Sequence, residues 1–242
     1  MRWLFLALLL LTRPALAAEP VDVALVLVTD VSRSIDDSEY DLEKRGTGNA
    51  FTDPRVITAI AHGALGRIAV AYIEFAGSSQ VKTVIPFTFI SNEATARAFA
   101  DRLIKAPRSF FGRTAISSGI DAAVALLDAA DLEAQRKVID VCGDGTNNAG
   151  REITEARDDA LNHNIIINGL TIINDHPVNY IFAHTAPPGG LTNYYRENVT
   201  GGPGSFVLEV HDFQTFGEAM TRKLITEIAA LALPARGKST KG

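Results

Sequence analysis

Short apolar segments alternate with polar or amphipathic segments along most of the chain, and this alternation limits the possible folds more than any other feature. The nearly continuous apolar run at 23–29 is typical of a strand buried on both faces of a parallel sheet. Further strands are predicted at 67–75, 80–89, 138–142, 165–173 and 205–210, and helices at 34–51, after Ser91, from 116, at 151–163 and after Asp212. The four-residue connection 76–79 makes the second and third strands an antiparallel hairpin. We therefore expect a three-layer, doubly wound, Rossmann-like α/β fold: a mostly parallel sheet of about six strands, one antiparallel edge strand, and helices on both faces.

Oxygen-bearing side chains follow the predicted strands at the edge where such sheets bind ligands. Asp30 ends the first strand, and Ser32 and Ser34 lie in the loop that leaves it; Thr114 precedes a helix, and Asp144 follows the strand at 138–142. Two carboxylates and three hydroxyls are hard donors, which suit Mg²⁺, Mn²⁺ or Ca²⁺ and disfavour zinc or copper. A cation between the two aspartates would explain why a buried strand ends on a charge.

These residues resemble those of the von Willebrand factor A (vWA) family. Asp30-Val31-Ser32-Arg33-Ser34 is similar to the D-x-S-x-S motif of that family, Thr114 to its second-loop threonine, and Asp144-Gly145 to its strand-end aspartate. In that family, these residues together form the metal-ion-dependent adhesion site (MIDAS). The stretches GRIAVAYIEFAG, VIDVCGDGTNNAG, ARDDALNHNIIINGLTI and YYRENVTGGPGSFV further resemble a bacterial family of exported vWA-like proteins that carries a domain-of-unknown-function label.

The resemblance implies roles for the five residues. Ser32, Ser34 and Thr114 would bind a divalent cation directly, with Mg²⁺ the first expectation and Mn²⁺ or Ca²⁺ the alternatives. Asp30 and Asp144 would bind it directly or through water. One coordination position would accept an Asp or Glu from a partner protein, so the chain is interpreted as a metal-dependent protein-binding module and not as an enzyme.

Other interpretations remain open at this stage. Asp30, Ser32 and Ser34 could instead cap a helix, because Asp and Ser favour helix N-termini. The segment from Asp144 to Glu155 loosely matches an EF-hand loop but has Ala149 where glycine is needed. A metal-dependent hydrolytic enzyme is the main rival, although no nucleophile and base are paired in the sequence. A ligand or ion sensor that uses the loop at 174–204 is a third possibility.

The first residues of the sequence suggest export. Residues 1–17 have the positive, apolar and small-residue regions of a signal peptide, so we expect a periplasmic or secreted protein with no membrane anchor after cleavage. The vWA-like domain is expected at 18–233, with an irregular insertion at about 174–204 and a flexible tail at 234–242.

The net charge of −5 argues against a nucleic-acid partner. The single cysteine, Cys142, is interpreted as a small buried hydrophobe.

Overall fold

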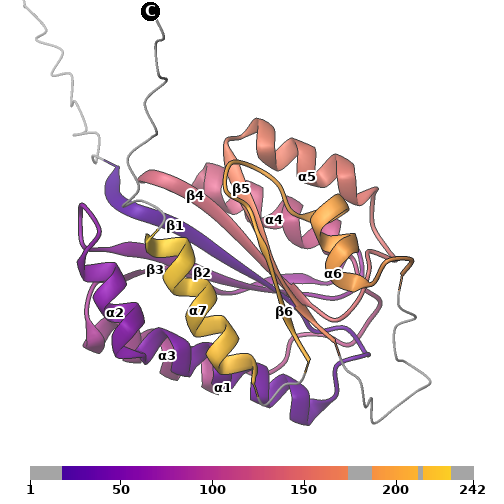
Figure 1. Cartoon of the computed structure of the whole chain (residues 1–242), viewed down its shortest axis with the longest axis horizontal. Coiled ribbons are helices and arrows are strands. Elements are labelled where there is room, and N and C mark those ends of the chain that lie inside the picture. The colour runs from indigo at the N-terminus through magenta and orange to yellow at the C-terminus, as the bar shows by residue number, and fades with distance from the viewer. Residues whose placement is uncertain (1–17, 174–186, 212–214, 230–242) are drawn as a thin grey trace, which may run out of the picture.

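The computed structural model of the chain describes residues 18–173, 187–211 and 215–229. Six strands form one central sheet in the order β3-β2-β1-β4-β5-β6 (Figure 1). The strands are β1 (Glu19–Asp30), β2 (Ile68–Phe75), β3 (Val81–Ile90), β4 (Leu132–Gly143), β5 (Ile165–Ile172) and β6 (Val207–Val210). The helices are α1 (Asp37–Thr52), α2 (Pro54–Ala61), α3 (Glu93–Lys105), α4 (Ile116–Ala129), α5 (Ile153–Asn162), α6 (Leu191–Tyr194), the π-helix η1 (Tyr195–Val199) and α7 (Phe216–Ala229).

The connections of the sheet place its functional edge. All neighbouring strands pair in parallel except β2 and β3, which form the antiparallel hairpin expected from their short connection. From β1 the chain moves to β2 on one side, and it later returns to β4 on the other side of β1. The carboxyl ends of β1 and β4 therefore flank the point where strand order reverses, which is the usual ligand position in open α/β sheets.

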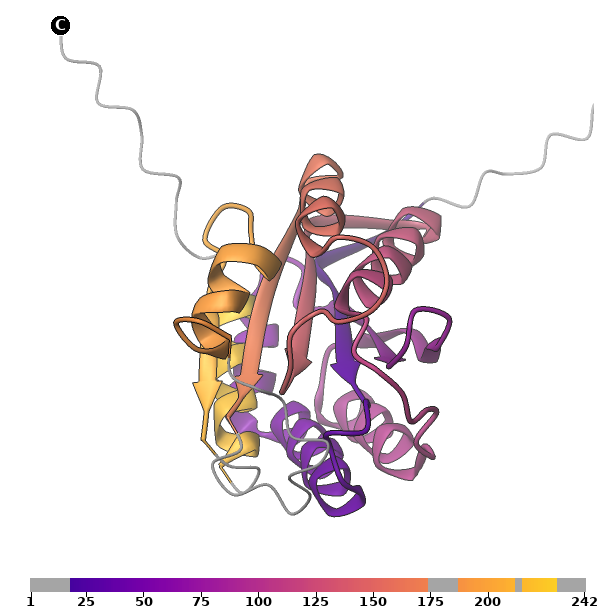
Figure 2. The same cartoon turned by 90° about the vertical axis from the view of Figure 1, so that its right-hand side faces the viewer.

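Helices cover both faces of the sheet, so the molecule has three layers (Figure 2). On one face, α1, α2, α3 and α7 bury a core that includes Phe51, Phe99 and Phe216. On the other face, α4, α5 and η1 bury a second core that includes Ile120 and Tyr195. β1 contributes alternate residues to both cores, which explains its continuous apolar sequence. The expected fold class is confirmed.

Two glycines allow α1 to pack closely on its neighbours. A Cβ atom at Gly46 would lie 2.7 Å from the Phe216 ring and 3.1 Å from the backbone of Gly217 in α7. A Cβ atom at Gly48 would lie 2.9 Å from Ile104 in α3. Glycine normally weakens a helix by about 1 kcal/mol relative to alanine, and here the close contact between helices offsets that cost.

Several boundaries differ from the sequence prediction. β4 begins at Leu132, six residues earlier than expected. Its first half is charged and only partly buried, so no apolar pattern marks it as a strand, but it pairs with the start of β1. α2 was not predicted, although Asp53 at its N-cap and Pro54 at its first position are ordinary start signals. Asn92, not Ser91, caps α3.

Some predictions fall on residues that the structure does not describe. These are the signal peptide at 1–17, the tail at 234–242 and the Asp212 cap, together with part of the segment at 174–204. The described part of that segment contains a helical turn near Tyr194, formed by α6 followed by η1. Among the described residues, no helix has the length and apolar character needed to cross a bilayer.

Candidate metal centre

The five predicted residues lie together at the carboxyl edge of the sheet. The hydroxyl of Thr114 donates a hydrogen bond of 3.1 Å to Oγ of Ser32, whose Oγ lies 3.1 Å from Oγ of Ser34. Ser34 in turn donates a hydrogen bond of 2.8 Å to Oδ1 of Asp144. Asp30, Ser32 and Thr114 are buried, whereas Ser34 and Asp144 are half-buried and form the opening of the cluster.

The buried carboxyl of Asp30 is in an unfavourable electrostatic environment. Its Oδ1 accepts a hydrogen bond of 2.7 Å from the backbone N–H of Ser32, while Oδ2 is buried and has no hydrogen-bond partner among the described residues. Burial raises the pKa of the Asp30 carboxyl well above its usual range, and the nearby charge of Asp144 raises it further. A buried carboxylate oxygen without a donor is costly. A divalent cation at this oxygen would relieve both the missing partner and the repulsion.

The structure decides against the helix-cap interpretation of Asp30, Ser32 and Ser34. The N-cap of α1 is Asp36, whose side chain accepts hydrogen bonds from the backbone N–H groups of Ser38 and Glu39. The Glu39 side chain accepts a bond from the backbone of Asp36, which completes a capping box. The three upstream side chains are therefore not needed to start the helix.

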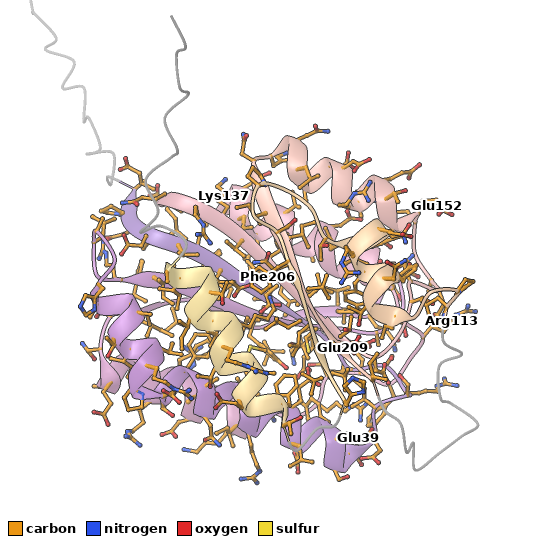
Figure 3. The ribbon with its side chains drawn as sticks, viewed as in Figure 1. Glu39, Arg113, Lys137, Glu152, Phe206 and Glu209 are labelled. Atoms are coloured by element: carbon orange, nitrogen blue, oxygen red, sulfur yellow. The ribbon has the colours of Figure 1, made fainter. Side chains whose placement is uncertain are left out.

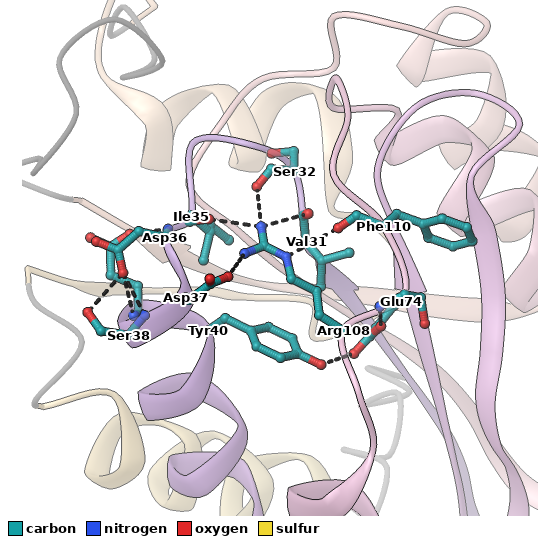
Figure 4. Close-up of polar contacts among 12 residues, drawn as sticks. Val31, Ser32, Ile35, Asp36, Asp37, Ser38, Tyr40, Glu74, Arg108 and Phe110 are labelled. Atoms are coloured by element: carbon teal, nitrogen blue, oxygen red, sulfur yellow. Dashed lines mark hydrogen bonds and ion pairs between the residues drawn. The ribbon is translucent and has the colours of Figure 1, made fainter.

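Arg108 holds the loop between β1 and α1 in place, although nothing in its sequence context predicted this role. Its Nη2 atom donates to three carbonyls of the loop, those of Val31 (2.9 Å), Ser32 (2.8 Å) and Ile35 (2.8 Å) (Figure 4). Nη1 forms an ion pair of 3.2 Å with Asp37, and only 6% of the Arg108 side chain is exposed. One guanidinium thus fixes the backbone that carries both serines.

Two asparagines join the loop after β4 to the loop before α4. The side-chain oxygen of Asn148 accepts a hydrogen bond of 2.9 Å from the backbone N–H of Thr114, and that of Asn147 accepts one of 3.0 Å from Ser117. The backbone N–H groups of Asn148 and Ala149 also donate to the carbonyl of Thr114. The turn at these asparagines therefore sets the distance between Thr114 and Asp144.

A second layer of polar groups lies beneath the cluster. A Cβ atom at Gly143 would lie 3.0 Å from Cβ of Asp30 and 2.9 Å from the hydroxyl of Tyr195, so only glycine fits at the end of β4.

Glu43 of α1 is 2% exposed, and neither of its carboxylate oxygens has a hydrogen-bond partner at normal distance and angle among the described residues. Burial raises the pKa of Glu43 to about 8, with smaller contributions from the charges of Asp30 and Asp144, while the Cys142 thiol lowers it. Cys142 is buried, as expected.

Within the described residues, no group of three or more His, Cys, Asp or Glu side chains could hold a metal ion. The cluster at the carboxyl edge differs from such sites because three of its five members are hydroxyls. Two carboxylates and three hydroxyls form an oxygen-only donor set, which suits a hard divalent cation.

The fold has clear structural relatives. Proximal thread matrix protein 1 from the mussel byssus superposes with a TM-score of 0.59 at 16% identity, over 88% of this chain and 46% of that one, and another structure of it has a zinc-occupied MIDAS motif. The pilus adhesin SpaC from Lactobacillus rhamnosus GG gives a TM-score of 0.59 at 15% identity, over 87% of this chain and 31% of that one. A von Willebrand factor type A protein from Catenulispora acidiphila gives 0.58 at 13% identity, over 86% and 43%. This chain thus spans less than half the length of each of these three relatives.

The fold is that of a vWA domain, as the resemblance implied. Residues 20–232 match the family described as "Protein of unknown function (DUF1194)", and the chain belongs to that family. A comparison with curated protein sequences gives no match.

Proposed function

We propose that this protein is an exported, non-enzymatic binding module that holds a divalent cation and presents it to a carboxylate of a partner protein. Asp30, Ser32, Ser34, Thr114 and Asp144 would hold the cation, either directly or, for the aspartates, through water. Mg²⁺ is the first candidate, and Mn²⁺ and Ca²⁺ are the alternatives. When bound, the cation would supply a Lewis-acid site, and the partner's carboxylate would complete its coordination.

The buried Oδ2 atom of Asp30 is the observation that carries this proposal. It lies at the bottom of a cluster of hydroxyls, close enough to Asp144 for the two charges to interact, and no described group donates to it. The relatives add support, because one of them has a metal in its MIDAS motif and another is a pilus adhesin. Their extracellular roles also agree with the signal-like sequence at 1–17.

An enzymatic role would need a general base near the cation, and three described carboxylates near this edge have other partners. Asp36 caps α1, Asp37 pairs with Arg108, and Glu74 accepts hydrogen bonds from the hydroxyl of Tyr40 and the backbone of Ser109. Glu43 is buried. These contacts favour binding over hydrolysis.

Calorimetric titration with Mg²⁺, Mn²⁺, Ca²⁺ and Zn²⁺ tests the metal site directly. We expect the wild-type protein to bind a divalent cation and Thr114→Val, which removes one hydroxyl and keeps the side-chain shape, to bind it more weakly. Thr83→Val, at an exposed position of β3, is the matched control and should bind like wild type. Absence of heat of binding in the wild type at millimolar metal would contradict the proposal.

The partner requires a second experiment. Immobilised wild-type protein should capture a protein from an extract of exported proteins in Mg²⁺ but not in chelator. The Thr114→Val protein should capture less of it at the same Mg²⁺ concentration. Turnover on phosphatase, protease, esterase or glycosidase substrates that depends on metal and is lost in Asp144→Ala would instead favour the enzyme.

A further inference from the structure

The loop that carries Thr114 also forms one rim of the candidate metal centre. Gly112 is buried, and its carbonyl accepts a hydrogen bond of 3.1 Å from the backbone N–H of Arg33, between the two serines. A Cβ atom at Gly112 would lie 2.0 Å from the side-chain oxygen of Gln80 and 3.0 Å from the backbone of Gly77. The backbone at residue 112 therefore packs closely between the loop after β1 and the loop that joins β2 to β3. Phe111 and Arg113 on either side of it are exposed.

Phe111 is an exposed apolar side chain at this rim. It is 58% exposed, the largest value among the large apolar residues that the structure describes as exposed. The guanidinium carbon of Arg108 lies 4.1 Å from the centre of its ring. Because Arg108 is itself fixed by three carbonyls, the ring rests on a rigid support. A single exposed apolar residue is ordinary on a protein surface, but this one is held in place beside a candidate binding site.

Two exposed arginines lie next to the ligand candidates at this rim. The chain has 23 Lys and Arg against 28 Asp and Glu, yet Arg33 and Arg113 are the exposed residues next to the ligand candidates Ser32, Ser34 and Thr114. Arg113 donates hydrogen bonds to the backbone and side-chain oxygens of Asn148, both of which are uncharged. Figure 3 shows Arg113 at the outer edge toward which the parallel strands run.

A bound divalent cation would offset Asp30 and Asp144, and Asp37 offsets Arg108. The positive charge of Arg113 then remains at the exposed rim, next to Thr114. A carboxylate of a partner would be attracted to Arg113, although the protein as a whole is acidic.

We infer that the partner presents an acidic segment with an adjacent apolar side chain. One Asp or Glu would bind the cation, a second carboxylate would pair with Arg113, and the apolar side chain would pack on the ring of Phe111. This inference rests on the proposed metal-dependent function and adds the chemistry of the partner to it. Phe111 and Arg113 would select the partner, and the five metal-binding residues would make its binding depend on the cation.

Selection from a random-peptide phage library tests the inference with defined probes. We expect peptides enriched in Mg²⁺ but not in chelator to contain two carboxylates and an apolar residue between or beside them. A synthetic copy of the best peptide should bind Phe111→Ser and Arg113→Gln about five- to tenfold more weakly than wild type. Both variants should keep the Mg²⁺ affinity of wild type in calorimetry.

Matched controls lie far from the rim. Leu65→Ser changes an exposed apolar residue at the opposite edge of the sheet, and Arg97→Gln changes an exposed arginine of α3; both should bind the peptide like wild type. The inference is wrong if the selected peptides lack the second carboxylate and the apolar residue, or if the Phe111 and Arg113 variants bind them normally. It is also wrong if Mg²⁺ binds but no peptide is enriched in its presence. Absence of Mg²⁺ binding itself would instead overturn the proposed function.

Discussion

The hydroxyl of Ser34 donates a hydrogen bond of 2.8 Å to Oδ1 of Asp144, 110 residues further along the chain. This bond joins the loop after β1 to the loop after β4, on the two sides of the point where strand order reverses. The hydroxyls of Ser32 and Thr114 extend the same chain of contacts, and the backbone N–H of Ser32 donates to buried Asp30. Hydroxyls that bond to one another and to a carboxylate are already gathered around one centre, so a cation could replace those contacts with little movement of the backbone.

The first prediction concerns metal-dependent stability. Wild-type protein should unfold at a higher temperature with excess Mg²⁺ than with chelator, because a ligand that binds only the folded state adds about 2.7 kcal/mol at a hundredfold excess over its Kd. At about 2–4 °C per kcal/mol for a domain of this size, this corresponds to roughly 5–10 °C. Asp30→Asn should lose this shift. Thermal melts of both proteins in each condition provide the measurement.

The choice of asparagine at position 30 separates charge from structure. Asn keeps the oxygen that accepts the backbone N–H of Ser32, and it removes the charge that repels Asp144. In chelator, Asp30→Asn should therefore be as stable as wild type or more stable. An equal metal shift in the two proteins would show that Asp30 does not contribute to metal binding.

The second prediction concerns Arg108. Arg108→Lys keeps the charge but lacks the planar guanidinium that reaches three carbonyls at once. The loop should lose its fixed shape, and we expect the affinity for metal to fall by roughly 10–100-fold, as for other groups that orient metal ligands. Calorimetric titration of the folded variant measures this. Arg97→Lys, in an exposed ion pair with Glu93, is the control; an unchanged Kd in Arg108→Lys would contradict the prediction.

Arg108 also illustrates what the sequence could not predict. Asp30, Ser32 and Ser34 could be placed because they follow a strand directly, and Thr114 and Asp144 because each lies next to a predicted element. Arg108 acts through contacts with carbonyls more than 70 residues away, and no local spacing marks such contacts. In the same way, the charged start of β4 has the composition of a surface loop, and only its pairing with β1 identifies it as part of a strand. The missed helix α2 is different, since its Asp-Pro start was visible in the sequence.

The third prediction concerns pH. The pKa of Glu43 is about 8 in the folded protein, mainly because of burial, against a usual value of 4.5. The folded state therefore binds one more proton than the unfolded state between these pH values. The contribution of Glu43 to the free energy of unfolding falls as pH rises from about 4.5 to 8. In chelator, Glu43→Gln should remove this slope and exceed wild type at pH 8–9 by a few kcal/mol, since each pH unit in the window corresponds to about 1.4 kcal/mol. Denaturant unfolding at several pH values measures it.

The control for Glu43 is on the same helix. Asp41→Asn changes an exposed carboxylate of α1 and should leave the pH dependence unchanged. With excess Mg²⁺, the wild-type slope should decrease, because a cation near Asp30 and Asp144 would lower the pKa of Glu43. A slope in Glu43→Gln equal to that of wild type would assign the pH dependence to other groups.

The last prediction concerns the buried ions between α7 and the sheet. Nζ of Lys223 lies 2.9 Å from Oδ1 of Asp140 and 2.7 Å from Oε1 of Glu227, and all three residues are at most 1% exposed. Asn168 donates a further hydrogen bond of 2.8 Å to Glu227. Lys223→Met would leave two carboxyl groups buried without a cation, which typically costs about 3–5 kcal/mol. We expect the melting temperature to fall by roughly 6–20 °C at about 2–4 °C per kcal/mol.

The pH dependence of this loss identifies its cause. Burial raises the pKa of Asp140 to about 7, and Lys223 opposes the increase. Without Lys223 the pKa should rise further, so the folded state keeps protons that the unfolded state releases, and the loss of stability should be larger at pH 8 than at pH 5. The triple variant with Asp140→Asn and Glu227→Gln should regain much of the loss, because no buried charge remains. Lys137→Met, which removes a partly exposed ion pair with Asp128, should cost less than about 1 kcal/mol. If Lys223→Met melts within the range of Lys137→Met at both pH values, the three buried groups do not act as an ionic cluster.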